Sequence, residues 1–282
     1  MIVQILRQAG DQRLSFRLLA VADGMGGAER GEVASRLTMS TLATYASEHL
    51  GDVLPEDIDG HIQFLRDAFA AVNERVYSSR DPRVPDKMGA TLVLACTIGP
   101  ALFVGNAGDS RCYLFRGGRI ERATKDDSLV QQLVDAGQLD ASQARSHPKR
   151  NVITKAIGIV PPDRFRASVT HVGTALDIEH ILLCSDGLHG VVTDEEIAHT
   201  VRAHGDPGVG AAALVDLAKR RGSTDNISVV LASVVPTPEA DSPPTPRFTR
   251  FGRGAGGRLA RGRSRRPARG VGGARPPSRS TP

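Results

Sequence analysis

The sequence predicts an α+β domain, in which helices and short β-strands occur along a chain of 282 residues. Short apolar runs such as 18–22 are typical of buried strands. Apolar residues at helical spacing in 62–76 indicate an amphipathic helix. The pair Gly117-Gly118 between two strand-like segments favours a β-hairpin, so adjacent strands are expected to be antiparallel.

The first half of the chain predicts a strand, two helices and two more strands. The strand at 18–22 stops at the glycine-rich sequence 23–27, where glycine permits backbone shapes that other residues avoid. A helix over 29–50 is expected to turn one face inward, formed by Ala34, Leu37, Thr41 and Tyr45. The next helix has the apolar stripe Ile62, Leu65, Phe69, Val72 and Val76. The two strands that follow are expected at 91–97 and 101–107, with Gly99-Pro100 as their turn.

The second half continues with strands and ends in two helices and a strand. Its hairpin is predicted at 111–115 and 120–123, and a polar, mobile segment at 124–150 with one short helix near 130–136. Further strands are expected at 166–172 and 180–184, helices at 194–202 and 208–221, and a last strand at 226–235. In that strand Ile227, Val229 and Leu231 form a uniformly apolar face.

Charge divides the chain into an acidic body and a basic tail. The net charge is +5, but residues 236–282 contain eleven arginines and only two acidic residues, so 1–235 carries about −4. The tail is rich in Pro, Gly, Arg and Ser, and we expect it to be disordered because it has too little apolar surface to offset its ordering entropy. We therefore predict a domain at 1–235 and a disordered basic tail at 236–282.

Cysteine usage and hydropathy predict a cytoplasmic protein. Cys96, Cys112 and Cys184 form no C-x-x-C pair and are expected to be buried thiols in a reducing compartment. No apolar run has the length of a membrane span, and the start of the chain lacks the features of a signal peptide. The chain has no tryptophan and few aromatic residues, which disfavours a base-stacking surface for nucleic acid.

Four aspartates lie where predicted strands begin or end: Asp23, Asp109, Asp186 and Asp225. A carboxylate at a strand tip is fixed by the sheet and open to solvent, which suits a ligand for a hard cation such as Mg²⁺ or Mn²⁺. Each aspartate taken alone is better explained as a turn former than as a metal ligand. Spacing alone does not show that the four converge.

The chain resembles the bacterial type 2C (PPM) protein phosphatases over about residues 15–235. The resemblance rests on eight ordered motifs, which are D-G-M-G-G at 23–27, G-E-V-A-S at 31–35, M-G-A-T-L at 88–92, G-N-A-G-D-S-R at 105–111, T-K-D-D-S at 124–128, S-H-P-K-R at 146–150, L-C-S-D-G-L at 183–188 and S-T-D-N-I-S-V-V at 223–230. It implies a four-layer α-β-β-α sandwich of two antiparallel sheets flanked by helices. It also implies hydrolysis of phosphoserine and phosphothreonine in proteins by a metal-bridged water that attacks phosphorus.

Roles for the aspartates follow only from this resemblance. It implies two Mn²⁺ or Mg²⁺ ions bridged by Asp23, with Asp186 and Asp225 as further ligands of the first ion. The carbonyl of Gly24 would face the second ion, and Asp109 with Asp186 would form a weaker third site. Asp23, Asp186 and Asp225 are thus the expected catalytic residues.

The start of the chain departs from the family pattern. Family members carry R-x-x-N-E-D before the first motif, and no such segment precedes Asp23. We therefore expect an N-terminally incomplete domain with a weakened second metal site, and a strand at 15–22 that lies nearer a sheet edge. Arg7 and Arg13 are expected to be surface charges. Met25 stands where eukaryotic members have His, so no general acid is assigned.

Three functions are compatible with the sequence. The first is a phosphatase that acts on phosphorylated Ser/Thr proteins, including a cognate kinase and its substrates. The second is a weak or inactive relative that binds phosphoproteins or serves as a scaffold. The third is a nucleic-acid binder that uses the arginine tail. Because the body of the chain is acidic, nucleic-acid binding would be at most an accessory role. A cysteine phosphatase is excluded, because none of the three cysteines begins a C-x5-R motif.

Overall fold

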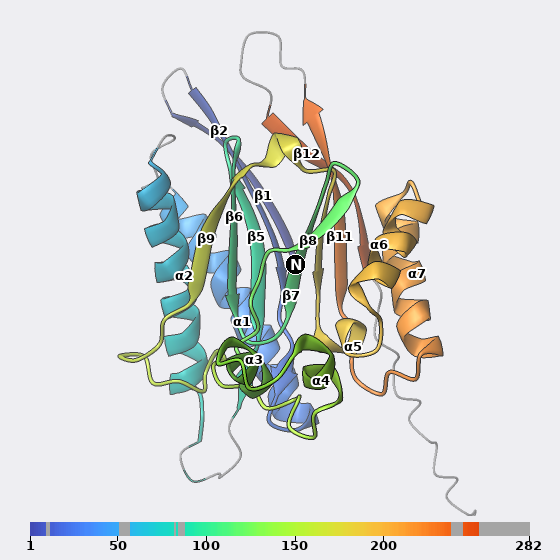
Figure 1. The fold of residues 1–282 in the computed structure, drawn as a ribbon. Helices are drawn as coiled ribbons and strands as arrows, with labels where there is room; N and C mark the ends of the chain where they lie inside the picture. The colour runs from blue at the N-terminus through green and yellow to red at the C-terminus, as the bar shows by residue number, and fades with distance from the viewer. Residues whose placement is uncertain (10–11, 51–56, 82, 84–87, 238–244, 254–282) are drawn as a thin grey trace, which may run out of the picture.

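The computed structural model describes residues 1–9, 12–50, 57–81, 83, 88–237 and 245–253. They form two five-stranded antiparallel sheets that lie face to face (Figure 1). The first sheet has the order β1-β2-β5-β6-β9, with strands Ile2–Ala9, Gln12–Val21, Leu92–Ile98, Ala101–Ala107 and Ser168–Thr174. The second has the order β12-β11-β10-β7-β8, with strands Thr245–Arg253, Val229–Thr237, His180–Cys184, Arg111–Arg116 and Arg119–Arg122.

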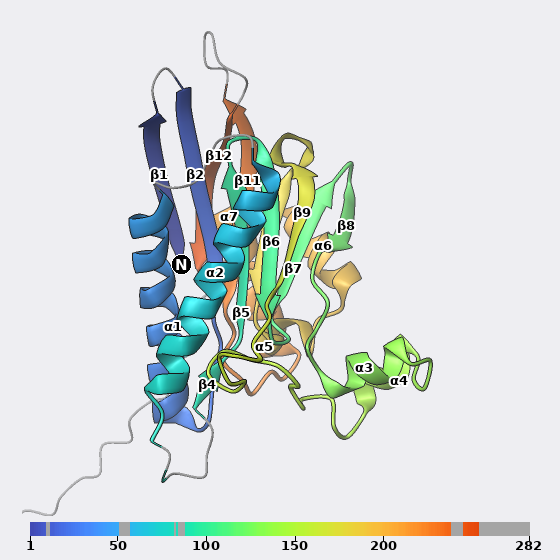
Figure 2. The same ribbon diagram turned by 90° about the vertical axis from the view of Figure 1, so that its left-hand side faces the viewer.

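Helices cover the outer face of each sheet, which gives four layers (Figures 1 and 2). The first sheet is covered by α1 (Ala28–His49) and α2 (Ile58–Ser78). The second is covered by α6 (Asp194–Ala203) and α7 (Pro207–Arg220), with the short α5 (Asp186–His189) at its end. The helices α3 (Leu129–Asp135) and α4 (Ala141–Ser146) lie beyond one end of the sheets. The predicted sandwich of two antiparallel sheets flanked by helices is confirmed.

The central strands of both sheets are buried on both faces, which explains the continuous apolar runs of the sequence. In β2, Leu18 packs under α1 and α2, whereas its neighbour Leu19 packs between the two sheets. In β11, Leu231 belongs to the predicted apolar face and packs against the helices of the second sheet, whereas Val230 lies between the sheets. Successive side chains on a strand point to opposite faces, so burial of both faces requires apolar residues at every position.

The buried face of α1 differs by about one residue from the predicted face. Leu37, Thr41 and Tyr45 are only partly buried, and the buried residues are Gly31, Ala34, Thr38, Leu42 and Ala46. The start of the helix explains the rotation. A Cβ atom at Gly24 would lie 1.9 Å from the carbonyl oxygen of Gly31, so close backbone packing brings this face of α1 inward.

The strand β1 corrects the expectation that the strand before Asp23 lies nearer a sheet edge. β1 pairs with β2 along its whole length, from Ile2 opposite Leu19 to Ala9 opposite Gln12. β2 is therefore an interior strand between β1 and β5. Gln4, Arg7 and Gln8 interrupt the apolar run of β1, so the segment lacks the continuous pattern of the other strands.

The strand β12 lies inside the segment that was predicted to be disordered. Residues Thr245–Arg253 pair antiparallel with β11, so for this stretch the prediction is wrong. A strand edge offers unpaired N–H and C=O groups, and pairing with it needs little apolar surface. Residues 238–244 and 254–282 lie outside the described part of the chain, and their expected disorder stays a prediction.

The remaining differences concern boundaries and short elements. The last strand begins at Val229 rather than at 226, which leaves Asp225 in the loop after α7. The helix α4 was not predicted, although Asp140 and Gln143 form a capping box at its start. The sequence pattern also missed the two-residue ribbon of β3 (Gly24–Met25) and β4 (Gly89–Ala90) and the 3-10 turn η2 (Ala175–Asp177). In the described residues, no helix has both the length and the apolar composition to cross a bilayer.

Candidate active site

Asp23 and Gly24 lie where β2 gives way to the short ribbon β3–β4. The backbone of Asp23 is held by Thr91, whose N–H donates to the Asp23 carbonyl at 2.8 Å. The Asp23 N–H in turn donates to Thr91 Oγ1 at 3.0 Å. Gly26 and Gly27 follow with φ of 105° and 83°, a region that favours glycine, and these turns lead into α1.

Asp109 follows β6, which is separated from β2 by β5 in the same sheet. The residue is only 7% exposed. Its carbonyl oxygen accepts a hydrogen bond from His189 Nε2 at 2.9 Å. Burial is the main cause that lowers the pKa of His189 to about 3, so this imidazole is neutral near pH 7. The sequence pattern gave His189 no role, because only the fold brings α5 against Asp109.

Asp186 and Asp225 are held close together by Ser185, the residue at the start of α5. Ser185 Oγ donates to the Asn226 carbonyl and accepts from the Ser228 N–H, both at 3.0 Å. The Ser185 N–H also donates to the Ser228 carbonyl at 3.0 Å. These bonds join the loop after β10 to the loop before β11, so one carboxylate comes from each.

The four predicted aspartates influence one another electrostatically, which shows that the fold brings them together. Burial, then the charges of Asp186 and Asp225, raise the pKa of Asp23 to about 8. Burial and Asp186 raise the pKa of Asp109 to about 7. The pKa of Asp186 is also raised, first by burial and then by Asp225, while the hydrogen bond with Asp23 lowers it. The hydrogen bond between the two side chains thus raises the pKa of Asp23 and lowers that of Asp186, so Asp23 is the donor of the pair.

The donor set fits a hard divalent cation. Asp186 Oδ1 is buried and has no hydrogen-bond partner among the described residues. A cation would satisfy this oxygen and relieve the repulsion within the cluster. In the described part of the chain, no three His, Cys, Asp or Glu side chains stand close enough together to hold a metal ion without adjustment. An open set of carboxylates suits Mg²⁺ or Mn²⁺, because such ions commonly retain several waters.

A cleft of about 550 Å³ opens beside three of these aspartates. Asp109, Asp186 and Asp225 line it together with basic residues that include Arg122, Arg145 and Arg150. Residues of α3 and α4 also line it, so the segment 124–150, which we call the flap, borders the cleft. A ligand in this cleft would therefore meet both carboxylates and arginines.

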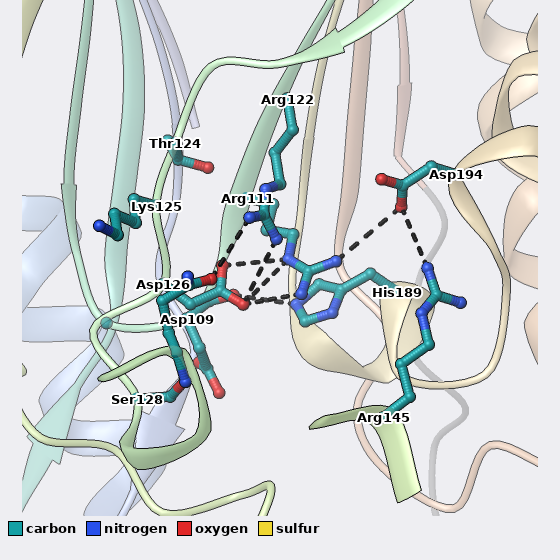
Figure 3. A network of polar contacts seen from close by, with 12 residues as sticks. Asp109, Arg111, Arg122, Thr124, Lys125, Asp126, Ser128, Arg145, His189 and Asp194 are labelled. Carbon is teal, nitrogen blue, oxygen red and sulfur yellow. Dashed lines mark hydrogen bonds and ion pairs between the residues drawn. The ribbon is translucent and has the colours of Figure 1, made fainter. Parts of the chain in front are cut away.

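An ion pair with little exposure fastens the start of the flap to the second sheet (Figure 3). Arg111 Nη2 lies 2.7 Å from Asp126 Oδ2, and Arg111 Nε donates to Asp126 Oδ1 at 3.0 Å. The two side chains are 14% and 9% exposed. Tyr113 Oη donates to Asp194 Oδ1 at 2.9 Å, and Arg145 of α4 lies 3.8 Å from the same oxygen. The flap is thus connected to α6 as well as to β7.

Asp127, the residue after Asp126, links the start of the flap to Gly108 and to Lys155, which follows the end of the flap. The Asp127 N–H donates to the Gly108 carbonyl at 2.8 Å, and the Gly108 N–H donates to Asp127 Oδ2 at 3.1 Å. Lys155 Nζ lies 2.9 Å from Asp127 Oδ1. From the sequence alone, Lys125, Asp126 and Asp127 are equally compatible with a solvated loop and with a flap. The structure makes Asp126 and Asp127 anchors of the flap, whereas Lys125 is mostly exposed and pairs with Asp135.

Comparison with known proteins places the chain in a family. The family model described as "Protein phosphatase 2C" matches residues 8–215. The serine/threonine protein phosphatase PstP of Mycobacterium tuberculosis is 38% identical over 222 residues, which cover 78% of this chain and 40% of that protein. The serine/threonine phosphatase stp of Listeria welshimeri is 30% identical over 218 residues and 83% of its length.

Solved structures agree with this family. Serine/threonine phosphatase Stp1 from Staphylococcus aureus superimposes with a TM-score of 0.70 at 28% identity, over 83% of this chain and 89% of that one. The catalytic domain of PstP in complex with two manganese ions gives a TM-score of 0.65 at 32% identity, over 83% and 97%. The four-layer sandwich described above is thus shared with solved serine/threonine phosphatases. The chain belongs to the protein phosphatase 2C family, and the predicted resemblance is confirmed.

Proposed function

We propose that this chain hydrolyses phosphoserine and phosphothreonine in proteins and that it uses Mn²⁺ or Mg²⁺. The observation that supports this most is that Asp109, Asp186 and Asp225 line one cleft, where the buried Oδ1 of Asp186 has no hydrogen-bond partner among the described residues. The chain spans about 40% of the length of the first matched relatives, which are both PstP sequences. One solved PstP structure contains two manganese ions, and we extend that use of metal to this chain.

The residues that would hold the ions are Asp23, the Gly24 carbonyl, Asp186 and Asp225, with Asp109 and Asp186 at a third, weaker position. When bound, such ions lower the pKa of water and neutralise charge on the phosphoryl oxygens. Asp23 contributes by remaining ionised once a cation removes the cause of its raised pKa. Neutral His189 holds the Asp109 carbonyl and therefore fixes the backbone at the third position.

Hydrolysis is better supported than phosphoprotein binding alone. Without cations, the three aspartates of the cluster that line the cleft would repel a phosphate group, so a module that only binds phosphate gains nothing from them. The arginine-rich tail could add weak, salt-sensitive attraction to acidic partners or nucleic acid.

The partners and the compartment follow from the same proposal. We expect phosphorylated Ser/Thr proteins as substrates, and a serine/threonine kinase as the enzyme that produces them. The three cysteines are buried and free, which agrees with a reducing cytoplasm.

Turnover of a phosphothreonine peptide separates hydrolysis from binding. We expect the protein with excess Mn²⁺ to release many equivalents of phosphate per equivalent of protein, measured with a colorimetric phosphate assay. A phosphotyrosine peptide of the same sequence serves as the control for substrate class. If the peptide keeps its phosphate and merely co-elutes with the protein, the chain is a binding module and the proposal is wrong.

A further inference from the structure

Thr91 lies between the two loops that carry Asp23 and Asp109, and its side chain is buried. Its exposed fraction is 2%, and that of its neighbour Ser110 is 1%. It immediately precedes β5, which lies between β2 and β6 in the first sheet. Asp23 follows β2, and Asp109 follows β6. One residue at the start of the central strand is therefore placed to contact both aspartate loops.

The hydroxyl of Thr91 takes the place of a backbone acceptor at the end of the β2–β5 ladder. The last paired residues are Val21 and Val93, and the same register continued by two positions sets Asp23 opposite Thr91. The Thr91 N–H does donate to the Asp23 carbonyl at 2.8 Å, as a ladder requires. The Asp23 N–H, however, donates to Thr91 Oγ1 at 3.0 Å. The side chain thus holds Asp23 at the point where the chain leaves the sheet.

The same side chain contacts both neighbours of Asp109. Thr91 Oγ1 lies 2.7 Å from Ser110 Oγ, a hydrogen-bond distance. On the other side, a Cβ atom at Gly108 would lie 2.7 Å from both Cβ and Cγ2 of Thr91, so the threonine packs directly on that glycine. Gly108 has φ of 115°, which also favours glycine there. The methyl group and the hydroxyl of Thr91 therefore contact residues on either side of Asp109.

We propose that Thr91 is a positioning residue that fixes Asp23 relative to Asp109 and so prepares the aspartate cluster for its cations. The proposal rests on the metal binding that the proposed function assigns to this cluster. Hydrogen bonds that orient metal ligands commonly change metal affinity by about 10- to 100-fold when they are removed. The Thr91 hydroxyl acts here through the backbone of Asp23 and through Ser110, and touches neither substrate nor metal.

The test is Mn²⁺ affinity, measured by isothermal titration calorimetry on the 282-residue chain. Thr91→Val keeps the shape that packs on Gly108 and removes the hydroxyl, so we expect Mn²⁺ affinity to fall about tenfold or more. Thr91→Ser keeps the hydroxyl, so its affinity should stay within about threefold of the wild type. Ser110→Ala removes only the second bond and should give a smaller loss.

Thr97 supplies a matched control on the same strand. It is fully buried, and its Oγ1 has no hydrogen-bond partner among the described residues. Thr97→Val should leave Mn²⁺ affinity unchanged. The thermal midpoint of each variant in chelator reports folding without metal. If Thr91→Val does not fold, the comparison uses Thr91→Ser and Ser110→Ala. Ser110→Ala must then lose more Mn²⁺ affinity than Thr91→Ser.

Three results would overturn the proposal. They are wild-type affinity in a folded Thr91→Val variant, an equal loss in Thr91→Ser, and a similar loss in Thr97→Val. Phosphate release is measured on the same samples. Wild-type protein that binds Mn²⁺ but releases no phosphate would reject the proposed function, and the role of Thr91 would still be decided by the affinities.

Discussion

Asp186→Asn is expected to lower turnover of a phosphothreonine peptide about a thousandfold, which corresponds to about 4 kcal/mol of lost transition-state stabilisation. Asparagine keeps the shape of the side chain but removes the negative charge that would hold the cation. Asp225→Asn should have a similar effect, since both residues are expected to serve the same ion. Asp109→Asn should cost less, because the third position is the weaker one. The measurement is kcat at saturating Mn²⁺.

Folding controls separate this loss from damage to the structure. Asp216→Asn, a surface carboxylate of α7 that is 64% exposed, should leave kcat unchanged. Equal losses from Asp109→Asn and Asp186→Asn would contradict the ranking of the sites. A loss that accompanies a large fall in thermal midpoint would show that Asp186 is needed for the fold rather than for the cation.

The same substitution should change how the stability of the metal-free protein depends on pH. The pKa of Asp23 is raised from 3.8 to about 8 in the folded state, so folded Asp23 keeps a proton that the unfolded chain releases. This contribution to stability is present below pH 4 and is lost as the pH rises toward 8. Asp186→Asn removes a charge that raises this pKa, so the fall in thermal midpoint between pH 5 and pH 8 should become smaller.

Arg111→Met is expected to destabilise the protein by about 3–5 kcal/mol, because it leaves Asp126 with little exposure and without its main partner. The only other cation paired with Asp126 in the described residues is Arg122, whose Nη1 lies 3.9 Å away. Tyr113 also loses a neighbour, since Arg111 Nη1 donates to its hydroxyl at 3.2 Å. The measurement is the free energy of unfolding from a urea titration.

A double variant distinguishes a lost ion pair from lost packing. In Arg111→Met/Asp126→Leu both charges are absent, so much of the lost stability should return. Arg116→Met, an exposed arginine on the same strand, should change stability by less than about 0.5 kcal/mol. If Arg111→Met costs less than about 1 kcal/mol, the pair is solvated and does not fasten the flap.

Local patterns predicted most of the strands and helices and the positions of the four aspartates, whereas the four layers followed from the resemblance to the phosphatase family. Apolar runs stop where buried strands stop, so Asp23, Asp109 and Asp186 could be placed at strand ends from the sequence alone. Asp225 was predicted at the start of a strand and instead lies in a loop, four residues before Val229. Its proximity to Asp186 depends on the bonds of Ser185, which no local pattern reveals.

Contacts between distant parts of the chain account for what was missed. β12 reaches β11 through backbone pairing, so its composition gave no signal. Thr91, His189 and Arg111 act at the site through partners that lie far away in the sequence. The capping box at Asp140 is a local signal for α4 that could have been recognised.

The dependence of phosphate release on free Mn²⁺ tests metal-dependent hydrolysis most directly. The protein is first stripped with chelator, and then kcat/KM for a phosphothreonine peptide is measured as Mn²⁺ is added. Stripped protein should be inactive, activity should rise and saturate with Mn²⁺, and alkylation of thiols should have no effect because all three cysteines are buried. Activity that survives complete removal of divalent metal and disappears on thiol alkylation would contradict the assignment of the aspartate cluster as the catalytic centre.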